Sequence, residues 1–367
     1  MLNKGSGLNM NICIVTIYNS PNYGAFLQAY VLYNVLKELG HEVTFLDTGA
    51  RKQSKKIIKS TIKKIILFKF EKAYFELKKY WTFKKYIKYC DLCRKDTNSM
   101  NNQDIFVFGS DEIWNISRDE INKYPILFGV GIPDSYFVSY APSINNTTLD
   151  ETFSNQTFLN ALQRFDKISA RDKHSQKILN LITKKPVEYV LDPIFLYNVK
   201  QYETIEEKIS KSGYILVYGY PNRFTSKNIN EIIEYAKSKN LTLISVGNYF
   251  DWCDKNIAAS PFEFLSYVRN ARYVITNTYH GTIFSIRYCK QFASYAGSQI
   301  KVMDILENLE LENQVVSESC TLENALGTNI DYIKVQEKLD RYIDDSYKYI
   351  HSFLENADKY IESRKKN

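Results

Sequence analysis

His280 is the residue whose type and setting most directly suggest chemistry. It follows a short β-prone run at 273–275 and a polar turn at 276–279, and apolar residues at helical spacing resume over 281–288. This spacing predicts a buried strand that ends in a loop and then feeds the N-terminus of a helix. Ligands bind at such strand ends in open α/β sheets, and a helix start favours an anion. An imidazole there could bind an anion and transfer a proton, or it could simply cap or pack at the strand end.

Three further polar residues follow buried strands in the first half of the chain. Ser110 and Asp111 come directly after the apolar run at 104–108, and Arg171 follows another strand-like run. A hydroxyl and a carboxylate at a strand end are placed where ligands bind, but the same residue types also cap turns. A guanidinium can bind a carboxylate or a phosphate through two parallel hydrogen bonds, or it can pair at the surface with the neighbouring Asp172. The sequence leaves these alternatives open.

The elements that would position these residues alternate between strands and helices. The opening predicts a βαβ unit, with strands at 11–18 and 41–47 and a helix at 25–39. Its first loop has neither the GxGxxG pattern of dinucleotide sites nor the P-loop pattern. The second half repeats the alternation, with strands at 214–218 and 241–246 and helices at 226–239 and 261–270. Repeated βα units in two halves predict an α/β protein with two Rossmann-like domains that face each other across a cleft.

The predicted domain boundaries follow from this alternation. We expect an N-terminal Rossmann-like domain at 1–198, a C-terminal Rossmann-like domain at 199–330 and a C-terminal helix at 331–367. A basic helical insertion at 51–95 interrupts the first domain. The polar run at 198–212 predicts the interdomain linker and a neighbouring helix, and we expect the terminal helix to break near Asp344.

The net charge of +7 over 367 residues comes from one basic segment. Residues 51–90 contain 14 Lys and Arg against Glu71 and Glu76, whereas the remainder contains 34 basic and 39 acidic residues. The lysines are interleaved with apolar and aromatic residues at roughly helical spacing, which predicts one or two solvated helices that pack on the domain. The sharper alternative is a surface helix that binds anionic lipid or anionic glycan. No nucleic-acid-binding motif accompanies the charge, so we expect no nucleic acid partner.

No stretch of the sequence has the pattern of a signal peptide or the length of a membrane-spanning apolar run. We therefore expect a cytoplasmic protein, and the basic segment raises the alternative of peripheral contact with the inner face of the membrane. Six scattered cysteines fit reduced thiols. Cys90 and Cys93 form a CxxC without a second pair, so we interpret them as ordinary helix residues. No cluster of His, Asp and Glu stands out, and we expect no required metal.

Six stretches of the sequence carry a recognisable pattern when they are taken together. They are NYGAFLQAYVLYNVLKELGHEVTFLD (22–47), DIFVFGSDEIWN (104–115), SYAPS (139–143), ISARD (168–172), VLDPIFL (190–196) and SPFEFLSYVRNARYVITNTYHGTIFSIRYCKQF (260–292). This series resembles the polysaccharide pyruvyl transferases, in the order of that family, and the combination is far more specific than any single motif. The sequence departs from the family where Ile144 and Asn145 follow Ser143, because a glycine is frequent there. It also has Tyr279 where Phe is frequent.

The resemblance implies a fold similar to that of the two-domain GT-B glycosyltransferases, with the active site in the cleft. It implies transfer of the enolpyruvyl unit of phosphoenolpyruvate to a sugar diol, which gives a cyclic pyruvate ketal and releases phosphate. Phosphoenolpyruvate is then the donor substrate, no cofactor is expected, and the acceptor is a surface glycan or its lipid-linked oligosaccharide precursor. The runner-up is a GT-B glycosyltransferase that uses a nucleotide sugar. A third alternative is a binding protein without catalysis that recognises an anionic glycan.

The same resemblance maps the family's ligand-handling residues onto His280, Arg171 and Asp111. We expect His280 and Asp111 to be catalytic. In the first assignment, a protonated His280 stabilises the phosphate or donates a proton, and Asp111 accepts a proton from the sugar hydroxyl, although the two roles could be reversed. Cationic and N–H donors must hold the two anionic groups of the donor. The expected substrate-binding residues are Asn22, Gly24, Ser110, Arg171, Thr278, Gly281 and Arg287.

Overall fold

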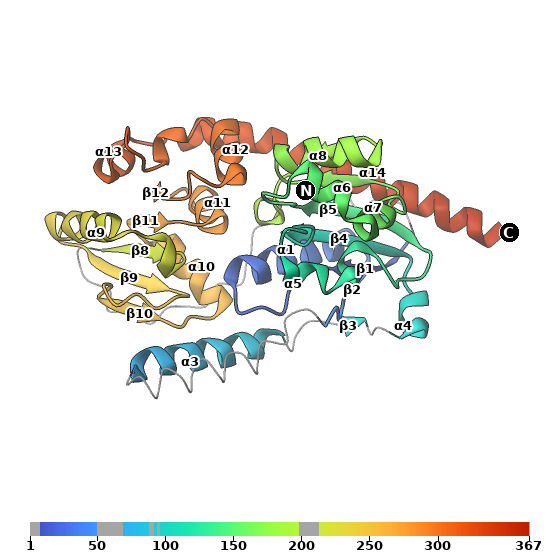
Figure 1. Ribbon diagram of the computed structural model, residues 1–367, viewed down its shortest axis with the longest axis horizontal. Coiled ribbons are helices and arrows are strands. Elements are labelled where there is room, and N and C mark those ends of the chain that lie inside the picture. Colours follow the sequence, from blue (N-terminus) through green and yellow to red (C-terminus); the bar gives the residue numbers. More distant parts are fainter. Residues whose placement is uncertain (1–7, 50–68, 88–91, 94–95, 198–212, 367) are drawn as a thin grey trace.

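Two α/β domains lie side by side along the long axis of the molecule (Figure 1). The computed structural model describes residues 8–49, 69–87, 92–93, 96–197 and 213–366, and all structural statements below concern these ranges. Each domain contains a parallel five-stranded sheet with helices packed around it. The arrangement is the predicted one of two Rossmann-like domains.

The sheet of the first domain is formed by apolar runs that become buried strands. Its strands are β1 (Asn11–Val15), β2 (Glu42–Leu46), β3 (Leu92–Cys93), β4 (Ile105–Asp111) and β5 (Tyr136–Pro142), and a separate parallel pair is formed by β6 (Ile168–Ala170) and β7 (Val187–Tyr189). The helices are α1 (Tyr23–Glu38), α3 (Phe70–Ile87), α4 (Thr97–Asn101), α5 (Asp119–Asn122), α6 (Leu149–Ser154), α7 (Gln156–Leu162) and α8 (Lys173–Thr183). All but the first residue of β1 and all but the last residue of β4 are buried, as expected for parallel strands that helices cover on both faces.

The second domain repeats this construction with helices whose starts are readable in the sequence. Its strands are β8 (Tyr214–Tyr218), β9 (Thr242–Val246), β10 (Lys255–Ile257), β11 (Tyr273–Thr276) and β12 (Gln291–Ser294). Its helices are α9 (Ser226–Ser238), α10 (Pro261–Asn270), α11 (Tyr279–Arg287), α12 (Ile300–Asn308), α13 (Leu322–Gly327) and the terminal α14 (Tyr332–Lys366). The start of α10 is defined by residues close in the sequence. Ser260 caps the helix, Pro261 is its first residue and Glu263 completes a capping box.

The two sheets have the same topology. Their strand orders are β3-β2-β1-β4-β5 and β10-β9-β8-β11-β12, so each sheet starts in its middle and then grows first to one side and afterwards to the other. The direction reverses between β1 and β4 in the first sheet and between β8 and β11 in the second. A crevice at the carboxyl ends of the strands is expected at each reversal, and such crevices bind ligands.

The helices α1 and α14 both contact the two domains. The first residue of α1, Tyr23, reaches into the second domain, where its hydroxyl donates to Ala259 O at 2.8 Å and its ring stacks on Phe264 with 4.5 Å between centroids. α14 leaves the second domain and packs back on the first, where the Tyr349 hydroxyl donates to Ser139 O at 2.8 Å. One continuous hydrophobic cluster therefore contains residues of both sheets.

Three details differ from the expectations. Cys93 lies in β3 rather than in a helix, because this short segment pairs with the edge of β2. α14 continues past Asp344 without a break, and it has buried apolar side chains on either side of that point, such as Leu339 and Tyr349. α11 begins at Tyr279, two residues before the expected start, because Thr278 already caps it. The predicted linker at 198–212 and Cys90 lie outside the described residues.

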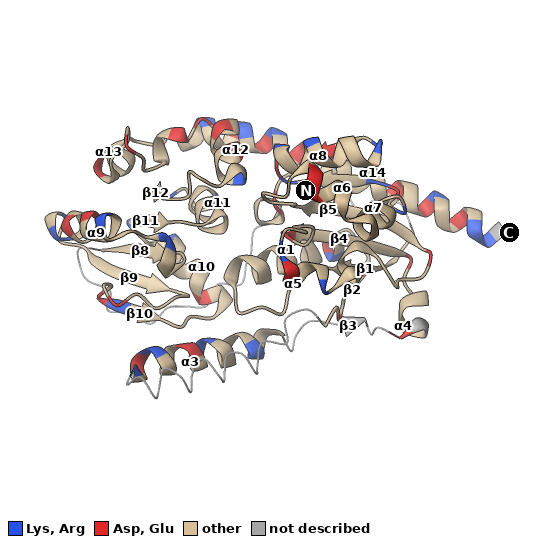
Figure 2. Ribbon diagram, in the orientation of Figure 1, with Lys and Arg blue, Asp and Glu red and all other residues tan. Residues whose placement is uncertain are grey.

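The described helices give no sign of a transmembrane segment. None of them combines the length and the apolar composition that crossing a bilayer requires. Even the 35-residue α14 carries charged side chains along its whole length (Figure 2).

Candidate active site

The crevices of the two domains face each other, and side chains from both meet there. Asp111 is the last residue of β4, Arg171 directly follows β6, and His280 is the second residue of α11. The N-termini of two helices also lie here. Asn22 caps α1 by accepting the Ala25 N–H at 3.3 Å, and Thr278 caps α11 by accepting the Gly281 N–H at 3.0 Å. Positive helix ends from both domains thus converge on one place.

His280 lies against the first turn of α1. A Cβ atom at Gly24 would come within 2.2–2.6 Å of three ring atoms of His280, so position 24 has no room for a side chain. Gly24 thereby lets a helix of the first domain contact the imidazole of the second. The buried Nε2 of His280 has no hydrogen-bond partner among the described residues, and it lies 3.9 Å from Asp192 Oδ2. Among the described residues this buried nitrogen therefore keeps an unused hydrogen-bonding position.

Arg171 holds two carboxylates together. Its Nη1 lies 2.7 Å from Asp192 Oδ2 and its Nη2 lies 3.0 Å from Asp111 Oδ1, and the side chain is fully buried. The guanidinium also lies 4.7 Å from the centroid of the Tyr279 ring. The alternative surface pair with Asp172 is wrong, because Asp172 instead caps α8 by accepting the Ser175 N–H at 2.7 Å. In this conformation Arg171 orients the site carboxylates and does not offer an open fork to a ligand.

Asp192 belongs to this cluster, although the sequence analysis did not select it. It is fully buried, pairs with Arg171 and is the carboxylate nearest to His280 Nε2. In the sequence, Asp192 followed by Pro193 has the pattern of a turn. Asp192 follows β7 by three residues, so the strand-end argument that selected Asp111 would also have selected it.

Burial and neighbouring charges separate the protonation states of the two candidate catalytic groups. Burial opposes ionisation of Asp111, but Arg171, His280 and Lys301 outweigh this effect and hold the pKa of the carboxyl well below its usual range. Burial lowers the pKa of His280 below its ordinary value, and the nearby Asp111 and Asp192 only partly oppose this shift. At neutral pH the site thus contains an ionised carboxylate and a neutral imidazole. This favours the reverse of the first assignment, in which His280 was protonated and Asp111 was the base.

A cavity of about 170 Å³, here called the inner lobe, lies in front of His280. Its lining includes Asp111 and three cations that the sequence analysis did not select, Arg118, Arg223 and Lys301. Lys301 is almost wholly buried and forms an ion pair with Glu112 across the cleft. Arg223 lies in the loop after β8, where the strand-end argument could have found it, whereas Lys301 sits within α12 and carries no such signal.

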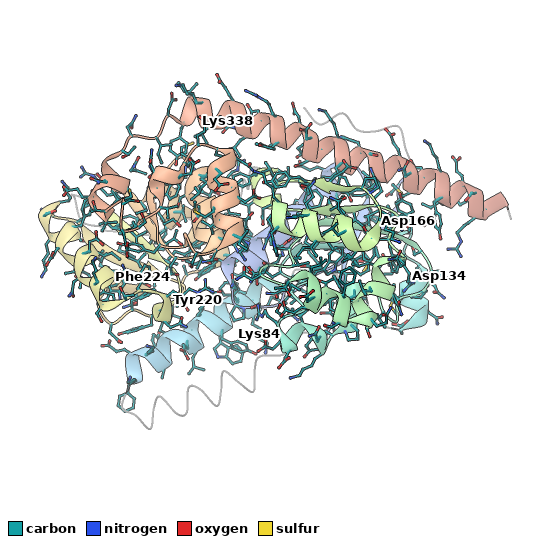
Figure 3. The ribbon with its side chains drawn as sticks, turned by 45° about the horizontal axis from the view of Figure 1, so that its top comes forward. Lys84, Asp134, Asp166, Tyr220, Phe224 and Lys338 are labelled. Atoms are coloured by element: carbon teal, nitrogen blue, oxygen red, sulfur yellow. The ribbon has the colours of Figure 1, made fainter. Side chains whose placement is uncertain are left out.

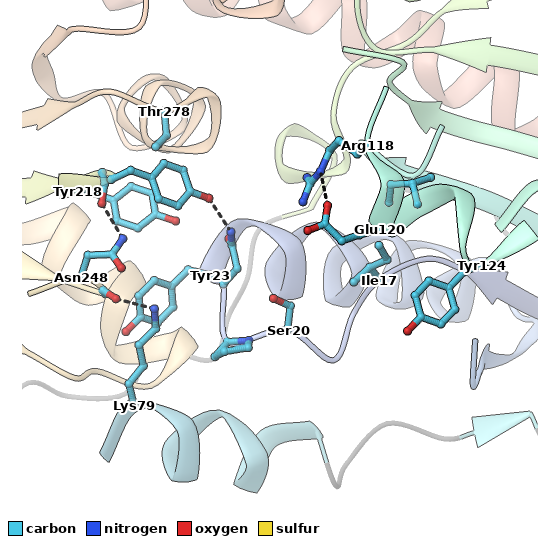
Figure 4. Close-up of a pocket in the computed structure, with 16 residues that line it drawn as sticks. Ile17, Ser20, Tyr23, Lys79, Arg118, Glu120, Tyr124, Tyr218, Asn248 and Thr278 are labelled. Carbon is cyan, nitrogen blue, oxygen red and sulfur yellow. Dashed lines mark hydrogen bonds and ion pairs between the residues drawn. The ribbon is translucent and has the colours of Figure 1, made fainter. Parts of the chain in front are cut away.

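A second cavity of about 550 Å³, here called the outer lobe, continues from the inner lobe (Figure 4). Asn22, Tyr218, Tyr220 and Thr278 line both cavities, so the two are lobes of one cleft. The side-chain amide of Asn22 donates to the Tyr220 hydroxyl at 3.3 Å and links the domains at the boundary between the lobes. Tyr220 accordingly lies between the two halves of the molecule (Figure 3).

Five of the seven expected binding residues line neither lobe, namely Gly24 and Arg171, described above, and Ser110, Gly281 and Arg287. Ser110 is fully buried, and its hydroxyl donates to Ala141 O at 2.9 Å. Gly281 packs on the end of β11, where a Cβ atom would lie 1.9 Å from Thr276 Oγ1, and its N–H is used by the helix cap. Arg287 is in the last turn of α11, about 10 Å along the axis from His280 at 1.5 Å per residue. The described residues also contain no group of three or more His, Cys, Asp or Glu side chains that could hold a metal ion.

Comparison with solved structures gives matches over nearly the whole chain at low identity. A structure from Listeria monocytogenes, provisionally assigned as a UDP-N-acetylglucosamine 2-epimerase, has 10% identity and a TM-score of 0.50 and covers 92% of this chain and 91% of that chain. The glycotransferase of kitacinnamycin has 10% identity and a TM-score of 0.49 over 97% of this chain and 99% of that chain. At such identities the likeness concerns the fold alone, which is the GT-B-like fold of two Rossmann-like domains.

Comparison of the sequence with known families is more informative. No curated protein matches the chain. The family model described as polysaccharide pyruvyl transferase matches residues 22–299, a range that includes the ends of β4, β6 and β11 and the start of α1. This range therefore contains Gly24, Asp111, Arg171 and His280, which the fold brings together in one cleft. The chain belongs to the polysaccharide pyruvyl transferase family.

Proposed function

We propose that the protein transfers the enolpyruvyl unit of phosphoenolpyruvate to two hydroxyls of an acceptor sugar, giving a pyruvate ketal and phosphate. Membership of the family supports a transferase that acts on polysaccharides. The observation that carries the donor assignment is the inner lobe, which cations from both domains line together with His280. Phosphoenolpyruvate carries a phosphate and a carboxylate, and these require cationic donors that converge from more than one side.

The proposed donor-binding residues are Arg118, Arg223 and Lys301. Arg118 belongs to the first domain and the other two belong to the second, so the donor would be held between the domains. The Arg118 side chain is 38% exposed, and its carboxylate contacts are long, at 3.7 Å to Glu120 and 3.8 Å to Glu112. It can therefore turn to a ligand at little cost. The N-termini of α1 and α11 add positive potential at the same place.

Neutral His280 is the proposed proton acceptor for the attacking sugar hydroxyl. As the hydroxyl oxygen bonds to C2 of the donor, Nε2 takes the proton, and the ionised Asp111 stabilises the imidazolium. Two C–O bonds to the sugar form at C2, and the C2–O bond to phosphate breaks. One hydroxyl proton ends on C3, which becomes a methyl group, and the other ends on the phosphate. The balance requires no oxidant and no further co-substrate.

A donor screen tests this proposal. Phosphoenolpyruvate at 100 times its dissociation constant should stabilise the folded protein by about 2.7 kcal/mol in thermal unfolding, and nucleotide sugars should not. His280→Asn should lower phosphate release in the presence of acceptor by roughly a hundredfold or more, and His351→Asn on α14 is the matched control. Stabilisation by a nucleotide sugar and not by phosphoenolpyruvate would replace the proposal with a nucleotide-sugar glycosyltransferase.

We propose further that the acceptor is a surface glycan or its lipid-linked precursor and that α3 contacts the inner face of the membrane in the cytoplasm. One face of α3 packs on the protein through Ala73, Phe75 and Phe83. Elsewhere on the helix Phe70, Tyr74 and Trp81 are 56%, 68% and 59% exposed, and basic side chains accompany them (Figure 2). Aromatic and basic residues combined on an exposed helix surface are typical of helices that lie in the membrane interface.

Vesicle sedimentation tests the membrane contact. The protein should sediment with vesicles that contain phosphatidylserine and not with neutral vesicles. Lys84→Glu/Lys85→Glu in α3 should weaken this binding by about 1 kcal/mol or more per residue, since each lysine near an anionic surface contributes about that amount. The matched control is Lys359→Glu/Lys365→Glu on α14. Equal recovery with neutral and anionic vesicles would contradict the electrostatic contact.

A further inference from the structure

Arg118 lines both lobes, but the residues that line the outer lobe alone take no part in the proposed donor binding or proton transfer. The outer lobe, at about 550 Å³, is three times the size of the inner lobe and lies within the usual range for small-molecule sites. Tyrosine side chains and asparagine amides line much of it, including Tyr124, Tyr220 and Asn248. Such a lining offers flat apolar surfaces together with hydrogen-bonding groups, which suits a chain of sugar rings.

One wall of the outer lobe comes from the basic insertion. α3 is inserted between β2 and β3 of the first domain, but it lies against the loop after β9 of the second domain. The Tyr249 hydroxyl donates to Glu71 Oε2 at 2.7 Å, and the rings of Phe75 and Tyr249 meet edge to face at 5.6 Å. α3 therefore bridges the domains beside the outer lobe.

Lys79 is the residue of α3 that reaches into this cavity (Figure 4). Its Nζ donates to Gly247 O at 2.5 Å and lies 5.8 Å from the centroid of the Tyr23 ring. An ammonium group has three donors, and no carboxylate lies within ion-pair distance of Lys79 among the described residues. Burial lowers the pKa of Lys79 to about 8, and Glu76 partly opposes this shift, so the side chain is largely charged at neutral pH.

We propose that the outer lobe binds the sugar chain of the acceptor and that Lys79 binds an anionic group on that chain, next to the sugar that enters the inner lobe. The proposal deepens the proposed function, on which it rests, by assigning the acceptor to an acidic class. The Nζ group is partly desolvated and keeps unused hydrogen-bond donors. An anion should therefore bind to it more tightly than to an exposed lysine, because charge interactions are stronger where water is partly excluded. The anionic group is a phosphate ester or a carboxylate, because both present oxygens that suit an ammonium donor.

Equilibrium binding of three probes of similar size tests the site on the full-length protein. The probes are lactose, lactose 1-phosphate and digalacturonate, measured by calorimetry with saturating phosphoenolpyruvate. At least one acidic probe should bind tenfold or more tightly than lactose, which corresponds to about 1.4 kcal/mol. Lys79→Met should reduce this preference to within about twofold, whereas Lys79→Arg should keep it. The control is Lys227→Met, at an exposed lysine of α9.

The outcomes separate the two proposals. The acidic probe that shows the preference identifies phosphate or carboxylate as the source of the anion. Equal binding of all three probes to the unaltered protein would overturn the inference, and so would a preference that survives in Lys79→Met. A third outcome is that Lys79→Met loses the preference for the acidic probe while the unaltered protein shows no pyruvyl transfer. This result would support the acidic subsite and would contradict only the proposed donor chemistry.

Discussion

At the residue scale, His280 and Asp111 share one buried cluster, yet burial and charge shift their pKa values so that one stays neutral and the other ionised. For the imidazole of His280, desolvation is the largest effect and lowers the pKa. For the carboxylate, the buried guanidinium of Arg171 outweighs desolvation together with the other nearby cations. The same surroundings thus place a neutral imidazole beside an ionised carboxylate, and such a difference in pKa suits the proposed roles of a base and a stabilising anion.

The pH dependence of turnover follows from the lowered pKa of His280. Because the imidazole must be neutral to accept a proton, kcat/KM should fall as pH decreases through a pKa that lies below the ordinary value of about 6.5. Above that pH the imidazole is already deprotonated, so titration of His280 should cause no further increase in kcat/KM. Initial rates of phosphate release measured between pH 5 and 8 check this. A midpoint on the acidic side above 6.5 would show that the protonated imidazole, or a different group, is required.

Gly24→Ala should impair catalysis without unfolding the protein. The added methyl group would collide with the ring of His280, and a displacement of about 1 Å in a catalytic group can cost roughly a hundredfold in rate. Overpacking of this kind should lower the free energy of unfolding by about 1–3 kcal/mol. Gly327→Ala in α13 is the control, because a Cβ atom there meets nothing within 4 Å. Normal turnover in Gly24→Ala would mean that His280 is not held by α1.

At the element scale, the ends of β4, β6 and β7 lie close enough for one guanidinium to link them. Asp111 ends the first strand, Arg171 follows the second, and Asp192 follows the third after a short turn. The ion pairs thus span the main sheet and the separate β6–β7 pair. They position the candidate catalytic carboxylate of Asp111 and also join two sheets that do not share a continuous ladder.

Arg171→Met should be strongly destabilising. It leaves two carboxylates without their cation in a buried site, which typically costs about 3–5 kcal/mol. Urea unfolding measures the loss, and Arg341→Met on the exposed side of α14 is the control, with little expected change. A loss of less than about 1 kcal/mol would indicate that Arg171 is not structural and would restore it as a ligand-binding fork.

At the scale of the whole molecule, the active site exists only where two copies of one topology face each other. The first domain contributes Asp111 and Arg171, and the second contributes His280, Arg223 and Lys301. The ion pair between Lys301 and Glu112 crosses the cleft beside the inner lobe, and the return of α14 holds the domains together. The contacts that hold the domains together therefore also hold the two halves of the candidate site in place.

A double-mutant cycle on Lys301→Met and Glu112→Gln measures this coupling. Since the two side chains are partners across the cleft, their effects on the free energy of unfolding should be non-additive by about 0.5–3 kcal/mol. The Michaelis constant for phosphoenolpyruvate should rise in Lys301→Met, because a cation is lost from the inner lobe. Purely additive effects would show that the pair does not hold the domains together.

Much of the fold could be predicted from local pattern. The apolar runs at 104–108 and 214–218 became buried strands, and Ser260 with Pro261 marks a helix start, because these signals depend on residues close in the chain. The strand-end argument found Asp111 and His280 for the same reason. It also selected Ser110, whose hydroxyl turned inward, since pattern alone does not reveal which neighbour a side chain will meet.

The sequence by itself determined the family, the two Rossmann-like halves and four residues that line the cleft, Asn22, Asp111, Thr278 and His280. The tertiary structure decided that Arg171 pairs with Asp192 and Asp111, that His280 is neutral, and that Lys301 and Lys79 line the two lobes. The physical reason is that the residues which contact one another in the site lie far apart in the sequence, so local pattern does not reveal their contacts. Lys301 meets a partner 189 residues away and Lys79 one 168 residues away, and pKa values depend on burial and on charges gathered from such distances.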